Sequence, residues 1–197
     1  PGRAAPKLSF MHESSFIHTY DEFFKNTVVP EYLKATGVAV DYQLISVGSL
    51  QTRMATAAET GNGPDITLTF FNWPFLFDEK LVDVSDIADG IGKKNGGWYK
   101  SAEEAVVVNG KWKAIPFSNI GQLMNWRTDW FKEIGVTKFP DTWEELYEVG
   151  KKLKAKDRPF GFELGHGFGD NHGWLYPLLW SYGGHEVEAD GKTVVID

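Results

Sequence analysis

Acidic side chains and histidines are the first residues of this chain to consider for chemistry that needs no cofactor. Glycoside hydrolysis needs two carboxyl groups that face each other across a sugar ring, and Glu13, Asp65, Asp83 and Asp170 are candidates for such a pair. Their spacing along the chain does not show which two of these carboxyl groups would face each other. Asp65 follows Pro64 directly, at the expected start of a strand, where an acidic residue commonly has the structural role of a turn or cap residue. A carbohydrate-active hydrolase with paired carboxylates therefore stays an alternative without an assigned site.

The five histidines form no recognisable metal or catalytic motif. A zinc site needs three or four converging ligands, but only His166 and His172 share a loop, and the chain contains no cysteine. A nucleophile elbow, a zincin motif and a P-loop are also absent, and the glycines of 165–169 lack the spacing and the helix of a dinucleotide fingerprint. We therefore predict no metal, no cofactor and no enzymatic activity, and we expect this loop to hydrogen-bond a ligand or its own backbone.

Aromatic residues are frequent: eight Trp, seven Tyr and 14 Phe make up 15% of the chain. Five of the tryptophans lie within apolar patterns and are expected to pack in cores, namely Trp98, Trp112, Trp126, Trp130 and Trp143. Trp73 and Trp174 differ, because each lies at a loop-to-helix junction beside Asn, Asp or His. A sugar site combines flat aromatic faces with short polar side chains, so packing and sugar stacking both remain open for these two residues.

The first third of the sequence alternates strand and helix patterns. Three strands are expected, at 7–11, 38–44 and 65–71. Between them, helical spacing of apolar residues runs from Ile17 to Val28, continues from Pro30 to Gly37, and appears again from Leu50 to Ala58. This order of strand, helix, strand, helix and strand predicts a parallel α/β sheet with right-handed crossovers.

Two later elements have clear local signals. Asn109-Gly110 between two apolar segments predicts a hairpin with a type I′ turn. Thr142 followed by Glu145 predicts a capping box for a helix that extends to the region of Lys156. Other helices are expected at 74–81, 98–105, 129–134 and 174–182, strands at 123–126 and 160–164, and a final hairpin around Asp190-Gly191.

Composition restricts the class of protein and its partners. Hydrophobic residues make up 42% and charged residues 24% of the 197 residues, which is typical of a globular protein. The sequence contains no run of about 18 apolar residues, which is the length needed to span a bilayer. The formal net charge of -7 repels phosphate backbones, so nucleic acid is not an expected partner. The leader from Pro1 to Lys7 resembles what signal-peptide removal leaves, although an artificial leader would look similar.

Five segments in one order and spacing carry a family resemblance. They are Asn62-Gly63-Pro64-Asp65-Ile66, the hairpin from Asn109 to Pro116, Trp126 to Gly135, Pro140 to Leu146, and Leu179 to Gly184. With them, nearly all of the chain resembles the extracellular sugar-binding proteins of ABC importers, the class that includes maltose-binding protein. The resemblance implies an α/β fold of the two-lobed periplasmic-binding-protein type, with parallel-sheet lobes joined by a hinge.

The resemblance also implies how the chain divides. Residues 1–117 would form the first lobe, and residues 118–197 the hinge crossing and the start of the second lobe. Family members are considerably longer and return to the first lobe after completing the second. We therefore expect this chain to be the N-terminal half of such a protein, with an incomplete first lobe. The whole protein is expected to be a monomer in the periplasm or outside the cell.

Ligand-binding residues follow from carrying the family's cleft over position by position. They are Glu13, Ser14, Asn72, Trp73 and Asn119, followed in the second lobe by Asp170, Asn171, His172 and Trp174. Open α/β sheets bind ligands beyond the carboxyl ends of their strands, where such loops lie. Ser14 could instead cap the first helix, and Asn119 could satisfy backbone groups at the hinge.

The resemblance implies a binding function. A mono- or oligosaccharide would be bound between the two lobes and delivered to the permease of an ABC transporter. Two alternatives remain open: the hydrolase with paired carboxylates, and a polyamine or metal binder on the same fold.

Overall fold

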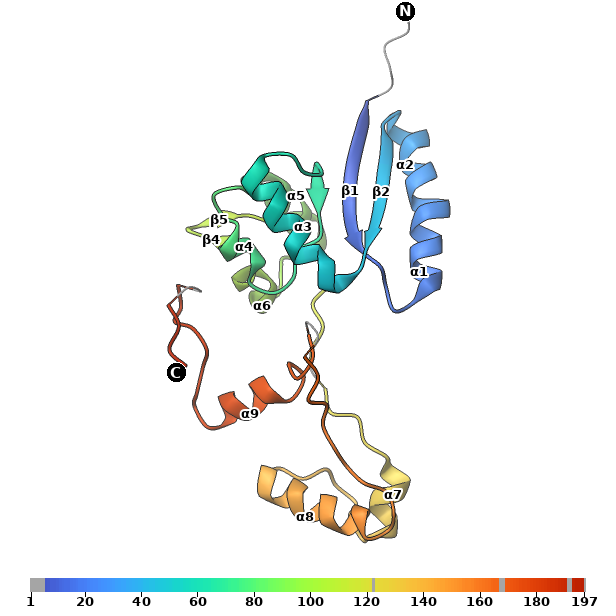
Figure 1. Ribbon diagram of the computed structural model, residues 1–197, viewed down its shortest axis with the longest axis vertical. Coiled ribbons are helices and arrows are strands. Elements are labelled where there is room, and N and C mark those ends of the chain that lie inside the picture. Colours follow the sequence, from blue (N-terminus) through green and yellow to red (C-terminus); the bar gives the residue numbers. More distant parts are fainter. Residues whose placement is uncertain (1–5, 122, 167–168, 191–192, 197) are drawn as a thin grey trace, which may run out of the picture. The chain divides into compact units, whose positions relative to one another are not determined.

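The structure, a computed structural model, describes residues 6–121, 123–166, 169–190 and 193–196 of the chain. It divides into two compact units: the first runs to Asn119 and also includes the segment Val187–Val195, and the second spans Ile120–Glu186. Figure 1 labels the helices and strands of both units. No helix in the described ranges is both long and apolar enough to cross a membrane.

The first unit is built on a parallel sheet of three strands in the order β2-β1-β3. The strands are β1 (Lys7–Glu13), β2 (Ala39–Ile45) and β3 (Ile66–Thr67). Lys7 lies opposite Ala39 and Glu13 opposite Ile45, so β1 and β2 end at the same edge of the sheet. The predicted parallel order is confirmed, but β3 is shorter than the stretch 65–71 that the sequence suggested.

Helices cover both faces of this sheet. The first crossover is one continuous helical segment made of α1 (His18–Phe23), the π-helical turn η1 (Phe24–Val28) and α2 (Val29–Thr36); the second crossover is α3 (Val47–Thr60). Successive strand residues point to opposite faces. Phe10 of β1 accordingly contacts Phe24 of η1, whereas Met11 lines a space next to α3. Leu50 on α3 is fully buried.

The rest of the first unit contains three helices and a hairpin. These are α4 (Trp73–Leu76), α5 (Ser85–Asn95), α6 (Lys100–Glu104), β4 (Val107–Val108) and β5 (Lys111–Trp112). The hairpin prediction is confirmed, because Asn109 and Gly110 both have positive φ angles, of 52° and 73°. A core cluster of Ala88, Val106 and Trp112 joins α5 to the hairpin.

The second unit contains α7 (Thr128–Glu133), α8 (Trp143–Lys154) and α9 (Leu175–Ser181). The predicted N-cap of α8 is confirmed, since the Thr142 hydroxyl oxygen accepts a hydrogen bond from the backbone N–H of Glu145 at 3.1 Å. Phe131, Val149 and Leu153 form the core between α7 and α8.

The strands predicted at 123–126 and 160–164 are wrong. The structure describes all of these residues, and none belongs to a strand. A strand is stable only when a neighbouring strand satisfies its backbone groups, and no such neighbour lies along these segments among the described residues. Of the predicted final hairpin, the described residues show a single antiparallel bridge, between Val187 and Val194. Its predicted turn residue Gly191 lies outside the described residues.

Candidate functional site

The carboxyl edge of the first unit's sheet brings predicted site residues to the ends of neighbouring strands. Glu13 is the last residue of the central strand β1, and the backbone N–H of Ser14 donates to the carbonyl of Ile45 at the end of β2, at 2.8 Å. Asn72 follows β3 and precedes the first residue of α4. Ser14 and Asn72 are exposed, and Glu13 is half-buried. This edge therefore presents short polar side chains from two loops.

A buried carboxylate that the sequence reasoning missed holds the loop after β1. Asp21 on α1 is only 7% exposed. Its oxygens accept the backbone N–H of Ser15 at 3.0 and 3.2 Å and the hydroxyl of Ser14 at 3.3 Å. Ser14 therefore does not cap α1, whose N-cap position is Ile17. The available signal was an acidic residue in the first turn of a helix that follows two serines.

Burial and like charges shape the electrostatics at this edge. Burial raises the pKa of the Glu13 carboxyl, the nearby Asp21 raises it further, and His12 opposes both. The pKa of Tyr42 is raised to about 12, mainly by burial and then by the negative charge of Asp21. Its hydroxyl has no hydrogen-bond partner among the described residues. The Nδ1 atom of the buried His12 lies 2.8 Å from the carbonyl oxygen of Glu13.

Trp73 and Asn119 have structural contacts in the first unit. The Trp73 side chain is 2% exposed, and its ring meets that of Phe70 edge-on with 5.4 Å between centroids. In this structure Trp73 therefore packs in the interior. The amide nitrogen of Asn119 donates to the hydroxyl of Ser101 at 3.0 Å. A ligand role for either residue stays a prediction.

In the second unit, the loop before α9 is fixed by side-chain contacts to the backbone. Asn171 has a φ of 69° and donates its amide to the carbonyl of Gly165 at 3.0 Å. A Cβ at Gly165 would overlap Oδ2 of Asp170, so a larger residue there would displace this carboxylate. The amide oxygen of Asn171 is buried with no partner among the described residues. The four predicted residues Asp170, Asn171, His172 and Trp174 thus lie in one compact loop.

Stacked aromatic rings surround this loop. Trp174 lies parallel to Phe162 with 4.8 Å between ring centroids, and its Nε1–H donates to the carbonyl of Glu163 at 2.9 Å. His172 stacks on Tyr176 at 4.9 Å. Phe162 and Tyr176 were not among the predicted site residues. The signal for Tyr176 was its spacing of four residues from His172, which places both side chains on one side of a helical turn.

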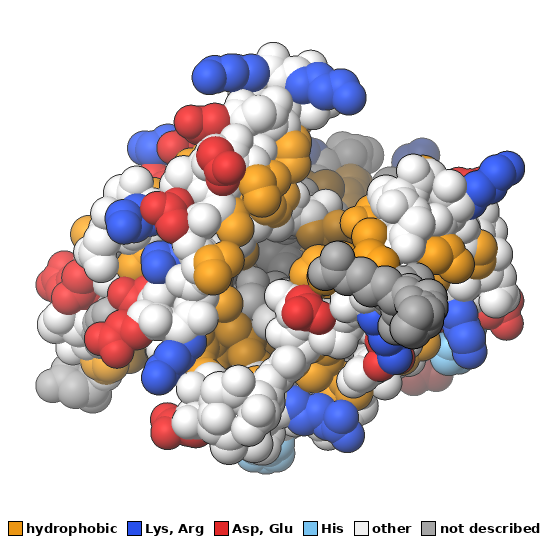
Figure 2. Space-filling view, turned by 90° about the horizontal axis from the view of Figure 1, so that it is seen from above, with side chains coloured by type: hydrophobic (Ala, Val, Ile, Leu, Met, Phe, Trp, Pro, Cys, Tyr) orange, Lys and Arg blue, Asp and Glu red, His pale blue; other side chains and the backbone are white. Residues whose placement is uncertain are grey.

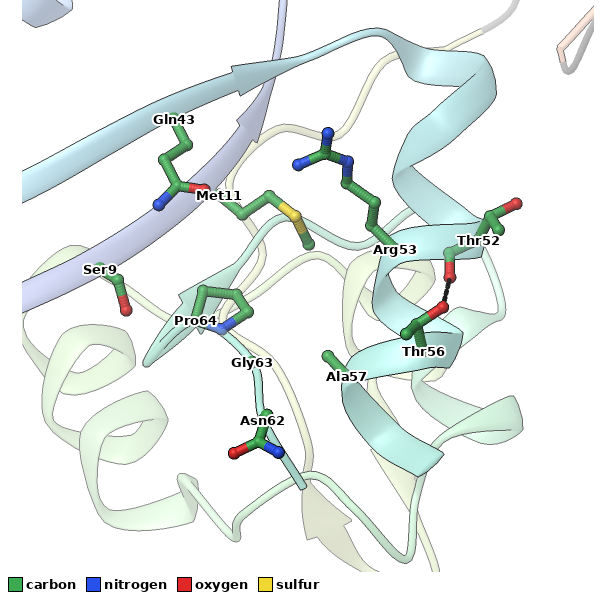
Figure 3. A pocket seen from close by; sticks show the side chains of 10 residues that line it. All are labelled: Ser9, Met11, Gln43, Thr52, Arg53, Thr56, Ala57, Asn62, Gly63 and Pro64. Carbon is green, nitrogen blue, oxygen red and sulfur yellow. Dashed lines mark hydrogen bonds between the residues drawn. The ribbon is translucent and has the colours of Figure 1, made fainter. Parts of the chain in front are cut away.

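Two pockets lie elsewhere in the units. One of about 520 Å³ lies between α3 and the sheet of the first unit, where Arg53 and Thr56 face Gln43 and Met11 (Figure 3). The other, of about 470 Å³, lies in the second unit beside Trp143 and Tyr182, among other residues. Neither pocket is lined by a predicted site residue.

Several polar groups at the first pocket already bind one another. The hydroxyl of Thr56 donates to the carbonyl of Thr52 at 2.9 Å. Ser9 donates its N–H and its hydroxyl to Asp65, both at 2.7 Å, and these bonds lower the pKa of that carboxyl. Asp65 thus has the turn role that its position after Pro64 suggested. These bonds occupy Thr56, Ser9 and Asp65, while the guanidinium of Arg53 also lines the pocket.

Comparison with known proteins gives the family. Residues 18–197 match the family described as bacterial extracellular solute-binding proteins. The chain belongs to this family. Among curated proteins, it is 29% identical over 138 residues to a "Probable ABC transporter-binding protein" of Deinococcus radiodurans, covering 66% of this chain and 32% of that protein. It is 23% identical over 160 residues to a diacetylchitobiose-binding protein of Streptomyces coelicolor, covering 81% and 37%.

Solved structures support the same fold. A maltose-bound MalE3 of T. maritima matches with a TM-score of 0.67 at 20% identity, over 96% of this chain and 49% of that one. A solute-binding protein of Thermotoga lettingae bound with α-D-tagatose matches with a TM-score of 0.66 at 20% identity and the same coverage. The expected periplasmic-binding-protein fold is confirmed. The chain spans about a third of the curated relatives' length, 32% and 37%, and about half of these structures, 49%.

Proposed function

We propose that this protein binds a carbohydrate outside the cytoplasm and delivers it to the permease of an ABC importer. The observation that carries the proposal is the match of residues 18–197 to the extracellular solute-binding family. The sugar class rests on relatives that are named for a sugar or were solved with one bound, among them the diacetylchitobiose-binding protein and the maltose-bound structure.

The polar edge of the first unit has the chemistry that sugar hydroxyls need. Glu13 offers carboxyl oxygens, and hydrogen bonds to a charged acceptor are stronger than those between neutral groups. Ser14 and Asn72 add a hydroxyl and an amide, which can each donate or accept. Glu13 ends β1, and Ser14 and Asn72 lie in loops beyond the carboxyl ends of parallel strands, where open α/β sheets bind ligands.

The aromatic loop of the second unit has the complementary chemistry. Trp174 and Phe162 form a stacked pair whose orientation is fixed by the hydrogen bond from Trp174 Nε1 to the carbonyl of Glu163. Flat rings of this kind pack against the C–H faces of sugars. Contact of both units with one solute, the boundary between 117 and 118, and a monomeric state remain proposals.

Binding without catalysis is proposed over hydrolysis. Two of the four candidate carboxylates are occupied in turns: Asp65 accepts from Ser9, and Asp83 accepts the N–H and hydroxyl of Ser85 at 3.0 and 2.6 Å. On the face shown in Figure 2, the acidic and basic side chains of the described residues are interspersed and do not gather into a basic patch of the kind that attracts nucleic acid.

The test uses the full-length protein and a panel of mono- and oligosaccharides, with spermidine and Zn²⁺ as non-sugar ligands. A ligand that binds only the folded state raises its melting temperature, so we expect one sugar class to do so. Chromatography after long incubation should recover that sugar uncut. A shift with spermidine or Zn²⁺ alone would refute the sugar class, and cleavage of the sugar would refute the binding role.

A further inference from the structure

The loop between β1 and α1 presents a large apolar side chain to solvent. Phe16 is 94% exposed, and its neighbour Ile17 is also exposed. Single exposed apolar residues are common and need no explanation. Phe16 differs because it lies two residues after Ser14, which with Glu13 forms part of the polar edge, and because the backbone on both sides of it is held in place.

Three sets of hydrogen bonds hold this loop. Before Phe16, the N–H of Ser15 donates to both oxygens of Asp21, as described above. After it, the N–H of Ile17 donates to the hydroxyl of Ser15 at 3.0 Å, and the carbonyl of Ile17 accepts from the N–H of Tyr20 at 2.9 Å. Phe16 is therefore displayed from an ordered loop, with almost no contact to its own unit.

This arrangement is costly for stability by itself. A carboxylate as buried as Asp21 loses hydration, and hydrogen bonds must offset that loss. The loop it orders displays a phenyl ring whose exposure gives no hydrophobic stabilisation. Ordering a side chain before a ligand arrives does, however, reduce the entropy lost on binding. The loop thus has the properties of a preorganised contact for a ligand with an apolar face.

We infer that Phe16 is a solute-stacking residue and that Asp21 is the positioning residue that presents it. This inference rests on the proposed function and adds to it a requirement on the solute. The solute must offer a C–H face to Phe16 next to hydroxyls that reach Glu13 and Ser14, as the ring of a sugar does. Small inorganic ions and metal ions have no such face.

The test measures solute dissociation constants by calorimetry on the full-length protein, with the best sugar of the panel. Phe16→Ala should weaken binding about tenfold, the scale of one lost aromatic contact, and should leave the melting temperature of the free protein unchanged. The matched control is Phe23→Ala, which removes a 56% exposed Phe from α1 and should change affinity less than twofold.

A double-mutant cycle tests the role of Asp21. Asp21→Ala should weaken binding by at least a similar factor, because it also releases the hydroxyl of Ser14. Combining it with Phe16→Ala should weaken binding by clearly less than the product of the two single effects, because both changes remove the stacking contact. Asp21→Asn retains one oxygen acceptor for Ser15 and should recover part of the affinity; it replaces Asp21→Ala in the cycle if that variant does not fold. A loss of stability alone would not produce this coupling.

The outcomes separate this inference from the proposed function. A wild-type protein that binds no sugar overturns the proposed function and this inference with it. If the wild type binds a sugar and Phe16→Ala binds it equally well, only the stacking role of Phe16 is overturned. If the effects of the Asp21 and Phe16 substitutions multiply, Asp21 does not act through Phe16, and its positioning role is overturned.

Discussion

Replacing Trp73 with alanine removes one of the largest buried side chains of the first unit. A buried indole covers about 150–250 Å², which at about 25 cal/mol per Å² corresponds to roughly 4–6 kcal/mol of burial free energy. That figure is an upper limit, because unfolded chains already bury some apolar surface. Because Trp73 is 2% exposed and contacts Phe70 edge-on, we expect Trp73→Ala to lower the free energy of unfolding by about 3–5 kcal/mol.

Urea unfolding of the full-length protein without solute, followed by far-UV circular dichroism, measures this loss. Trp73→Phe retains an aromatic ring and should lose clearly less stability than Trp73→Ala. Tyr99→Ala removes a 77% exposed ring of the same unit and should change the free energy of unfolding by no more than about 0.5 kcal/mol. The midpoint should shift with the slope unchanged.

A different result would support the stacking role that the sequence left open for Trp73. If the free energy of unfolding of Trp73→Ala lies within about 1 kcal/mol of the wild-type value but the variant binds sugar much more weakly, the packing argument is refuted. The ring would then leave its buried position when solute binds.

Three further predictions follow from single contacts. Because burial raises the pKa of Glu13, its contribution to stability is complete below its ordinary pKa of 4.5 and is lost as the pH rises through the raised value. Glu13→Gln should therefore melt higher than the wild type at pH 7 and lose this advantage in melting scans near pH 4. Thr142→Ala removes the N-cap of α8 and should cost about 1 kcal/mol in urea unfolding, whereas an equal stability of both proteins would contradict the capping role. Gly63→Ala places a Cβ 2.6 Å from the Cβ of Ala57 and should cost about 1–3 kcal/mol. Gly48→Ala, with open space around its Cβ, is the control and should cost nothing in the same assay.

The first crossovers and the hairpin could be predicted because their signals are local. Strand and helix periodicity along residues 7–60 depends on side-chain spacing, and the positive φ angles at Asn109 and Gly110 depend on backbone sterics. The cap at Thr142 is likewise a bond to a residue three positions away. Such features need no partner from a distant part of the chain, so the sequence alone was sufficient.

Helix α5 was missed because its sequence contradicts its conformation. Its segment contains Gly90 and Gly92, and glycine weakens helices. The reason for Gly92 lies elsewhere in the chain, since a Cβ there would come 2.7 Å from Nε1 of Trp98. The helix therefore depends on packing that no local pattern records.

At the candidate site, the sequence by itself determined which residue types follow the strands. That Glu13 ends β1, that Ser14 follows it, and that Asn72 follows β3 is set by the order of elements. Only the tertiary structure decided that Asp21 holds the loop, that Trp73 is buried, and that residues 160–164 form no strand. Each of these depends on contacts between groups that are brought together by folding. The pattern of residues along the chain gives their spacing in the sequence but does not give those contacts.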